Sequence, residues 1–143
     1  MSSQVSSLET GNPTTVLLID DNYEHRKYWS AALRNSPFRY SVLEADSGDS
    51  GLDLYRHQRV DCVVLDLDMP ESGFFVLLRL IQEPKSPQVA VVVLTQLVHP
   101  TLCAMMKDNG AYACLTKQHS SDEDLANVIQ QAIASVKSTQ DEA

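Results

Sequence analysis

The chain has 143 residues, a length that fits one compact domain and leaves little room for a second independent module. Apolar residues make up 43% of the chain and charged residues 21%, which is ordinary for a globular protein with a hydrophobic core. With 19 acidic and 11 basic residues the formal net charge is −8, so repulsion of nucleic acid and of anionic membrane surfaces is expected.

The first 14 residues are mostly polar and lack the charged and apolar segments of a secretory signal. We expect residues 1–14 to be a flexible N-terminal arm, residues 15–137 to fold as one domain, and residues 138–143 to be a flexible tail. No apolar run approaches the roughly 20 residues that span a bilayer. A cytoplasmic protein is therefore predicted.

From residue 15 onward, short apolar runs alternate with segments that keep a helical apolar spacing. This alternation predicts a five-stranded parallel sheet in a doubly wound, flavodoxin-like (βα)5 fold with three α/β/α layers. The predicted strands are Val16–Ile19, Arg39–Glu44, Cys62–Leu67, Val89–Leu94 and Ala113–Thr116. The predicted helices are Tyr23–Arg34, Asp49–His57, Phe74–Ile81, Thr101–Asn109 and Ser121–Val136.

Two helix ends carry specific signals. Gly110, after Asn109, is suited to the positive φ that often ends a helix. The last helix has two possible capping boxes at its start, Ser120 with Glu123 or Ser121 with Asp124.

The cysteines and histidines show no metal-binding spacing. Cys62, Cys103 and Cys114 form no paired motif and lie in or beside apolar stretches, so they are expected to be small core residues. The histidines are scattered and are expected on the surface or in loops: His25, His57, His99 and His119.

Reactive side chains follow four of the predicted strands. Asp20 and Asp21 follow the first strand, Asp66 the third apolar run, Thr95 the fourth and Lys117 the fifth. Because the carboxyl ends of parallel strands meet at one sheet edge, these side chains are expected to lie together. Clustered carboxylates repel one another unless a cation neutralises them, and Mg²⁺ prefers such hard oxygen ligands. One carboxylate could then attack phosphorus and form an acyl phosphate.

The motifs that contain these residues occur in a recognisable order. They are Ile19-Asp20-Asp21, Leu65-Asp66-Leu67-Asp68-Met69-Pro70 with Gly73, Leu94-Thr95, and Leu115-Thr116-Lys117. Together they resemble the signature of response-regulator receiver domains, over about residues 15–136. The resemblance implies that Asp66 is the phosphoacceptor and that Thr95 and Lys117 each contact a phosphoryl oxygen. The Mg²⁺ ligands that it implies are Asp20, Asp21, Asp66 and the backbone carbonyl of Asp68.

The same resemblance implies a signalling protein rather than an enzyme, active only in its own phosphorylation and slow autodephosphorylation. Its phosphodonor would be a histidine kinase or a histidine phosphotransfer protein. A downstream protein would bind the surface made by the fourth helix, fifth strand and fifth helix, which rearranges on phosphorylation.

The chain departs from the family pattern at three positions. Gln96 replaces a very small residue after the threonine, Cys114 replaces an aromatic residue, and Gln118 replaces a proline that shapes the loop after Lys117. Gln96 is expected to slow access to the site, and Lys117 to be held less rigidly. Tyr112 is a speculative substitute for the missing aromatic residue.

Three other interpretations stay open. The chain could be a pseudo-receiver that binds its partner without phosphorylation, as the three departures favour. Asp66-Leu67-Asp68 also matches the paired acids of haloacid dehalogenase phosphohydrolases, although the early position of Asp20-Asp21 does not. Finally, Asp20-Asp21 could simply cap the helix that starts near Tyr23.

Overall fold

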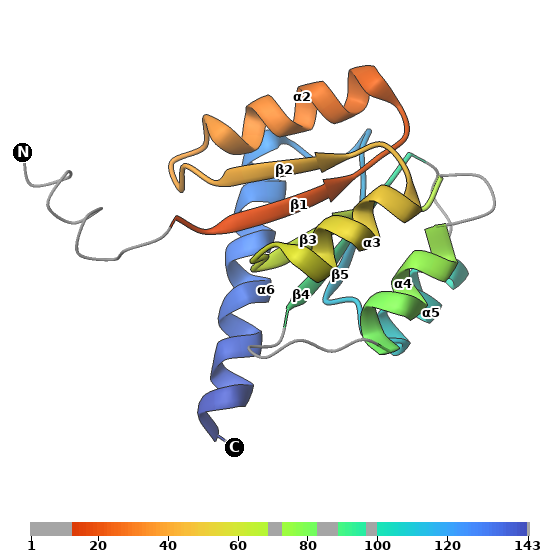
Figure 1. Ribbon diagram of the computed structural model, residues 1–143, viewed down its shortest axis with the longest axis vertical. Coiled ribbons are helices and arrows are strands. Elements are labelled where there is room, and N and C mark those ends of the chain that lie inside the picture. The colour runs from red at the N-terminus through yellow and green to blue at the C-terminus, as the bar shows by residue number, and fades with distance from the viewer. Residues whose placement is uncertain (1–12, 69–72, 83–88, 97–99, 143) are drawn as a thin grey trace, which may run out of the picture.

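Five parallel strands form one sheet in the order β2-β1-β3-β4-β5 (Figure 1). The computed structural model describes residues 13–68, 73–82, 89–96 and 100–142. The strands are β1 (Thr15–Ile19), β2 (Ser41–Ala45), β3 (Cys62–Leu65), β4 (Ala90–Thr95) and β5 (Ala113–Thr116). The order reverses beside β1, as in a doubly wound sheet, so the predicted fold class is confirmed.

Helices cover both faces of the sheet. They are α2 (Tyr23–Arg34), α3 (Gly48–His57), α4 (Gly73–Gln82), α5 (Pro100–Asp108) and α6 (Asp122–Glu142). Helices α2 and α6 lie on one face, and α3, α4 and α5 lie on the other (Figure 1). In the described part of the chain, no helix is both long and apolar enough to cross a membrane.

Successive residues of β1 serve the two cores in turn. Leu17 and Ile19 pack in the core beneath α3 and α4, whereas Val16 and Leu18 pack in the core beneath α2 and α6. All residues of β3 and β4 are buried because both sheet faces are covered. At the sheet edge, the four residues of β5 are only half-buried.

Local backbone features explain where elements begin and end. Arg39 has a φ of 53°, outside the range of a strand, so β2 begins at Ser41 rather than at Arg39 as predicted. Gly110 has a φ of 117° after α5, as predicted. At the start of α6, Asp124 N–H donates to Ser121 Oγ at 3.0 Å and Ser121 N–H donates to Asp124 Oδ2 at 2.9 Å. Of the two predicted capping boxes, this pair forms.

Helix α6 runs to Glu142 and so continues beyond Val136, the end that the apolar spacing indicated. Most of the predicted N-terminal arm, residues 1–12, lies outside the described residues, as does the Met69-Pro70 part of the receiver motif.

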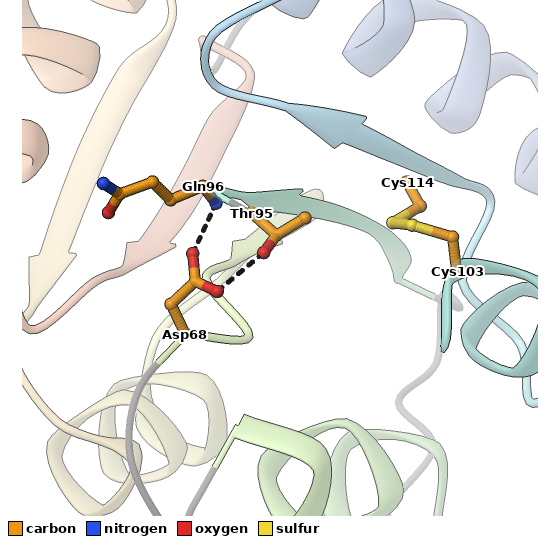
Figure 2. Close-up of a disulfide and its surroundings, with 5 residues drawn as sticks. All are labelled: Asp68, Thr95, Gln96, Cys103 and Cys114. Carbon is orange, nitrogen blue, oxygen red and sulfur yellow. Dashed lines mark hydrogen bonds between the residues drawn. A yellow bond between two sulfur atoms is a disulfide. The ribbon is translucent and has the colours of Figure 1, made fainter. Parts of the chain in front are cut away.

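The cysteine prediction is correct for one residue and wrong for two. Cys62 is free and fully buried in β3, as expected of a small core residue. Cys103 of α5 and Cys114 of β5 instead form a disulfide, with their Cα atoms 5.6 Å apart (Figure 2). The pairing arises because α5 packs back along β5, a tertiary contact that a separation of 11 residues does not signal.

Candidate functional site

The parallel register brings four strand ends to one edge of the sheet. Ile19 of β1 is opposite Leu65 of β3, and Thr95 of β4 is opposite Thr116 of β5. Backbone hydrogen bonds continue one residue past the strands, since Asp66 N–H donates to Ile19 O at 3.0 Å and Lys117 N–H donates to Thr95 O at 2.8 Å. The backbone is therefore fixed where the predicted reactive residues begin.

Lys117 reaches across the sheet edge to two buried acids. Its Nζ lies 2.8 Å from Asp20 Oδ2 and 3.5 Å from Asp66 Oδ2. Asp20 is 1% exposed and Asp66 is 3% exposed, so both carboxylates are almost completely withdrawn from solvent. Arg26 adds support by donating from Nη1 to the backbone carbonyl of Asp20 at 2.8 Å.

The exposed Asp21 completes an acidic cluster with Asp20 and Asp66. One carboxylate oxygen from each residue lies within 4.8 Å of the other two, a spacing that fits a single metal ion. Neither Asp20 nor Asp21 caps α2, because the cap is Asn22, whose side chain accepts from His25 N–H at 2.9 Å. The capping interpretation of this pair is therefore wrong.

The cluster has the donor chemistry that Mg²⁺ requires. Three carboxylates cluster together and two of them contact the ammonium of Lys117, so these side chains, when ionised, carry an excess of negative charge. Burial raises the pKa of Asp66 to about 7; the Asp20 carboxylate raises it as well, whereas Asp68 N–H and Lys117 lower it. Lys117 alone does not neutralise the negative charge around an ionised Asp66, and a divalent cation that prefers hard oxygen ligands would do so.

The carboxylate of Asp68 accepts hydrogen bonds from two donors beside this cluster (Figure 2). Its Oδ1 accepts from the Thr95 hydroxyl at 2.9 Å, and its Oδ2 accepts from the backbone N–H of Gln96. The backbone N–H of Asp68 in turn donates to Asp66 Oδ1 at 2.9 Å. The Gln96 side chain points away from Asp68 and Thr95 (Figure 2). The sequence did not indicate the hydrogen bonds of the Asp68 carboxylate to Thr95 and Gln96.

His25 is a site residue that sequence reasoning placed on the surface. Lys117 Nζ lies 3.0 Å from His25 Nδ1, and because an ammonium can only donate, Nδ1 is the acceptor. A cavity of about 380 Å³ opens beside this contact and is lined by His25, Tyr28, Trp29, Gln96, Lys117, Gln118 and Ser120. Only the position of His25 in the first turn of α2, shortly after the acid pair, could have signalled this role.

Two of the three departures have clear structural settings. Gln118 is exposed, yet the Lys117 side chain is only 7% exposed and contacts Asp20, Asp66 and His25, so these side chains hold it. Tyr112 precedes β5 and is 40% exposed, so it packs in neither core. Cys114, where the family has an aromatic residue, is bonded to α5.

Comparison with known proteins gives consistent results. The family model described as "Response regulator receiver domain" matches residues 16–130. The two-component response regulator ORR11 of Oryza sativa subsp. indica is 32% identical over 109 residues, which cover 75% of this chain and 73% of that protein. Protein-glutamate methylesterase/protein-glutamine glutaminase 1 of Myxococcus xanthus is 31% identical over 110 residues, covering 76% of this chain but 31% of that protein.

Other relatives are also much longer than the matched region. The chain matches 21% of a probable cyclic di-GMP phosphodiesterase of Vibrio cholerae and 35% of the probable transcriptional regulatory protein TcrX of Mycobacterium tuberculosis. Among solved structures, a receiver domain protein of Clostridium thermocellum is 27% identical with a TM-score of 0.76, covering 87% of this chain and 97% of that chain. A CheY-like receiver domain protein of Methanospirillum hungatei shares the fold at 16% identity, with a TM-score of 0.78 and coverage of 90% and 99%.

The family match begins in β1 and ends inside α6, so it includes every strand of the sheet and every strand end described above. The chain belongs to the response regulator receiver domain family.

Proposed function

We propose that this receiver takes up a phosphoryl group on Asp66 in a two-component or phosphorelay system. The proposal rests mainly on one observation: the buried Asp66 carboxylate belongs to the acidic cluster with Asp20 and Asp21 and lies 3.5 Å from Lys117. A nucleophilic carboxylate in this setting has both a cationic side chain and potential metal ligands close by. Both are needed to bring an anionic phosphodonor close.

In the proposed reaction, an Asp66 carboxylate oxygen attacks phosphorus of a phosphohistidine. The O–P bond forms as the P–N bond breaks, and the imidazole leaves with the electron pair of that bond. Lys117 offsets charge on one phosphoryl oxygen, and the Thr95 hydroxyl donates to another. Asp20, Asp21, Asp66 and the backbone carbonyl of Asp68 would hold Mg²⁺, which would supply charge neutralisation.

The partners follow from the family and the charge of the chain. The proposed donor is a histidine kinase or a histidine phosphotransfer protein, and the proposed setting is the cytoplasm, where kinases find ATP. The net charge of −8 disfavours nucleic acid as a partner. We assign the output to a protein that binds α5, β5 and α6, and we assign the receiver to residues 15–137. In this role the chain is a signalling protein rather than an enzyme.

Mass spectrometry after treatment with a small acyl phosphate donor and Mg²⁺ tests the proposal. The parent chain is expected to gain one phosphoryl group, and Asp66→Asn to gain none. Asp46→Asn is the matched control, because Asp46 is an exposed acid that follows β2 at the same sheet edge. Labelling of Asp66→Asn, or loss of labelling in Asp46→Asn, contradicts the assignment of Asp66.

One structural observation favours a phosphorylation-independent binding module, because the Asp68 carboxylate already pairs with Thr95. If the folded parent resists labelling in Mg²⁺ and Asp68→Ala resists it too, this alternative replaces the proposal.

A further inference from the structure

The Cys103–Cys114 disulfide joins α5 to β5 (Figure 2). Helix α5 has few buried residues of its own. Of the nine residues of α5, Met106 is the only buried one, and Leu102 and Cys103 are half-buried. By comparison, α3 buries four of its ten residues. Apolar burial is the main force that holds a helix to a sheet, and α5 has less of it than α3. The position of α5 against the sheet therefore depends strongly on the disulfide.

The disulfide joins α5 to β5, the strand that leads to Lys117 in the site. Cys114 is opposite Val93 in the register of β4 and β5, and the same ladder continues to Thr95 and Thr116. Lys117 follows directly on β5. A constraint on the position of α5 relative to β5 therefore acts on the strand that leads to Lys117 and on its neighbour that ends in Thr95.

The two bonded cysteines are far more accessible than the third. Cys103 and Cys114 are both half-buried, so each residue keeps part of its surface open to solvent. Cys62 is fully buried, and burial raises the pKa of its thiol well above the ordinary value, which suppresses the reactive thiolate. The chain thus combines a reactive pair with an unreactive internal control.

We propose that Cys103 and Cys114 are a reversible oxidation site whose state sets how tightly α5 is held against β5. Disulfides in the cytoplasm, the compartment proposed for this chain, are mostly transient and redox-sensing. In reduction, a dithiol reductant gives up two electrons and two protons, the Cys103–Cys114 bond breaks to two thiols, and the reductant becomes a disulfide. Reoxidation by a small-molecule disulfide reverses the exchange and releases two thiols.

Hydrogen exchange of the α5 amides, followed in the full chain with and without a dithiol reductant, tests the site without a phosphodonor. Differential alkylation and mass spectrometry establish the redox state of each sample. Exchange in α5 is expected to be roughly tenfold faster or more after reduction, because the cross-link no longer opposes local opening. Equal exchange in verified oxidised and reduced samples overturns the proposal.

Three variants separate redox control from general loss of stability. Cys103→Ser and Cys114→Ser should each exchange like the reduced parent in oxidant, with no response to reductant. Cys62→Ala should keep the full response of the parent. A response that survives in either serine variant, or that disappears in Cys62→Ala, also overturns the proposal.

The effect on signalling and the assignment to the cytoplasm both rest on the proposed function. If Asp66 is labelled, the label should change α5 exchange in the reduced chain and leave it unchanged in the oxidised chain. Failure of labelling refutes the phosphoacceptor role alone, whereas an equal response to the label in both redox states refutes the proposed link between the bond and the switch.

Discussion

The hydroxyl of Thr95 donates a hydrogen bond of 2.9 Å to the carboxylate of Asp68. The hydroxyl that we assign to a phosphoryl oxygen is therefore already paired with an anion of the chain itself. The backbone N–H of Gln96 donates to the same carboxylate, so one acid satisfies two neighbouring donors. A phosphoryl group that uses the Thr95 hydroxyl has to displace Asp68 first.

Removing this acid should speed phosphorylation. Asp68→Ala is expected to raise the rate of labelling by a small phosphodonor about tenfold, since charge-assisted hydrogen bonds no longer compete and a repelling charge is gone. The rate is measured by quenched time courses and mass spectrometry. Asp46→Asn, which removes an exposed charge at the same sheet edge, should change the rate less than twofold by comparison. A slower Asp68→Ala would show that the carboxylate assists the reaction.

The raised pKa of Asp66, about 7, predicts a pH-dependent stability in the absence of Mg²⁺. Because the pKa of Asp66 in the folded chain is above the unfolded value near 3.9, the folded chain binds this proton more tightly. The stability that the bound proton contributes is complete below about pH 4 and is lost as the pH rises through about 7. Asp66→Asn has no such proton. From pH 5 to pH 8 its free energy of unfolding should therefore gain roughly 2 to 3 kcal/mol relative to the parent. Denaturant titrations at both pH values measure this difference, and a constant difference would contradict the raised pKa.

Mg²⁺ should stabilise the parent through the acidic cluster. Once the free Mg²⁺ concentration exceeds the dissociation constant, each further tenfold increase in concentration is expected to add about 1.4 kcal/mol to the free energy of unfolding. Thermal unfolding at increasing Mg²⁺ concentration measures the effect. Asp21→Asn should weaken the response because it removes one of three clustered carboxylates, whereas Asp46→Asn should keep it. An equal response in Asp21→Asn would exclude that carboxylate as a ligand.

His25 should act as a positioning residue for Lys117. His25→Ala removes the Nδ1 acceptor, 3.0 Å from the ammonium, and is expected to lower the labelling rate roughly threefold to tenfold. His25→Gln offers an amide oxygen as a replacement acceptor and should recover part of the rate. His57→Ala is the control, since His57 is exposed in α3. If both His25 variants lose labelling rate and stability to the same extent, the contact with Lys117 does not explain the lower rate.

The capping box of α6 should contribute to stability independently of phosphorylation. Ser121→Ala is expected to lower the free energy of unfolding by about 1 kcal/mol, because Asp124 N–H loses its acceptor. Ser120→Ala should have little effect, because the described capping bonds involve Ser121 and Asp124 only. Urea denaturation compares the two variants, and a larger loss for Ser120→Ala would reverse the assignment.

Periodicity and strand endings were enough to predict the fold and the edge where the reactive residues gather. That success has a physical reason: parallel strands share one direction, so a residue that follows an apolar run must lie at the carboxyl end of the sheet. Asp20, Asp66 and Lys117 follow this rule and are brought together.

The contacts that were missed join separate elements. The side chain of Asp68 turns toward β4, and His25 reaches Lys117 from α2 across 92 positions of sequence. The disulfide depends on how α5 packs on β5. None of these contacts produces a periodic signal, so a single sequence without an alignment does not reveal them.

Trp29 is the only tryptophan of the chain, and it is 5% exposed where it lines the cavity beside Lys117. The protein therefore carries one indole fluorophore next to the residues that we assign to phosphoryl transfer, and no dye or engineered reporter is needed. Its emission gives an optical readout of events at this sheet edge, recorded in the unaltered chain and in real time.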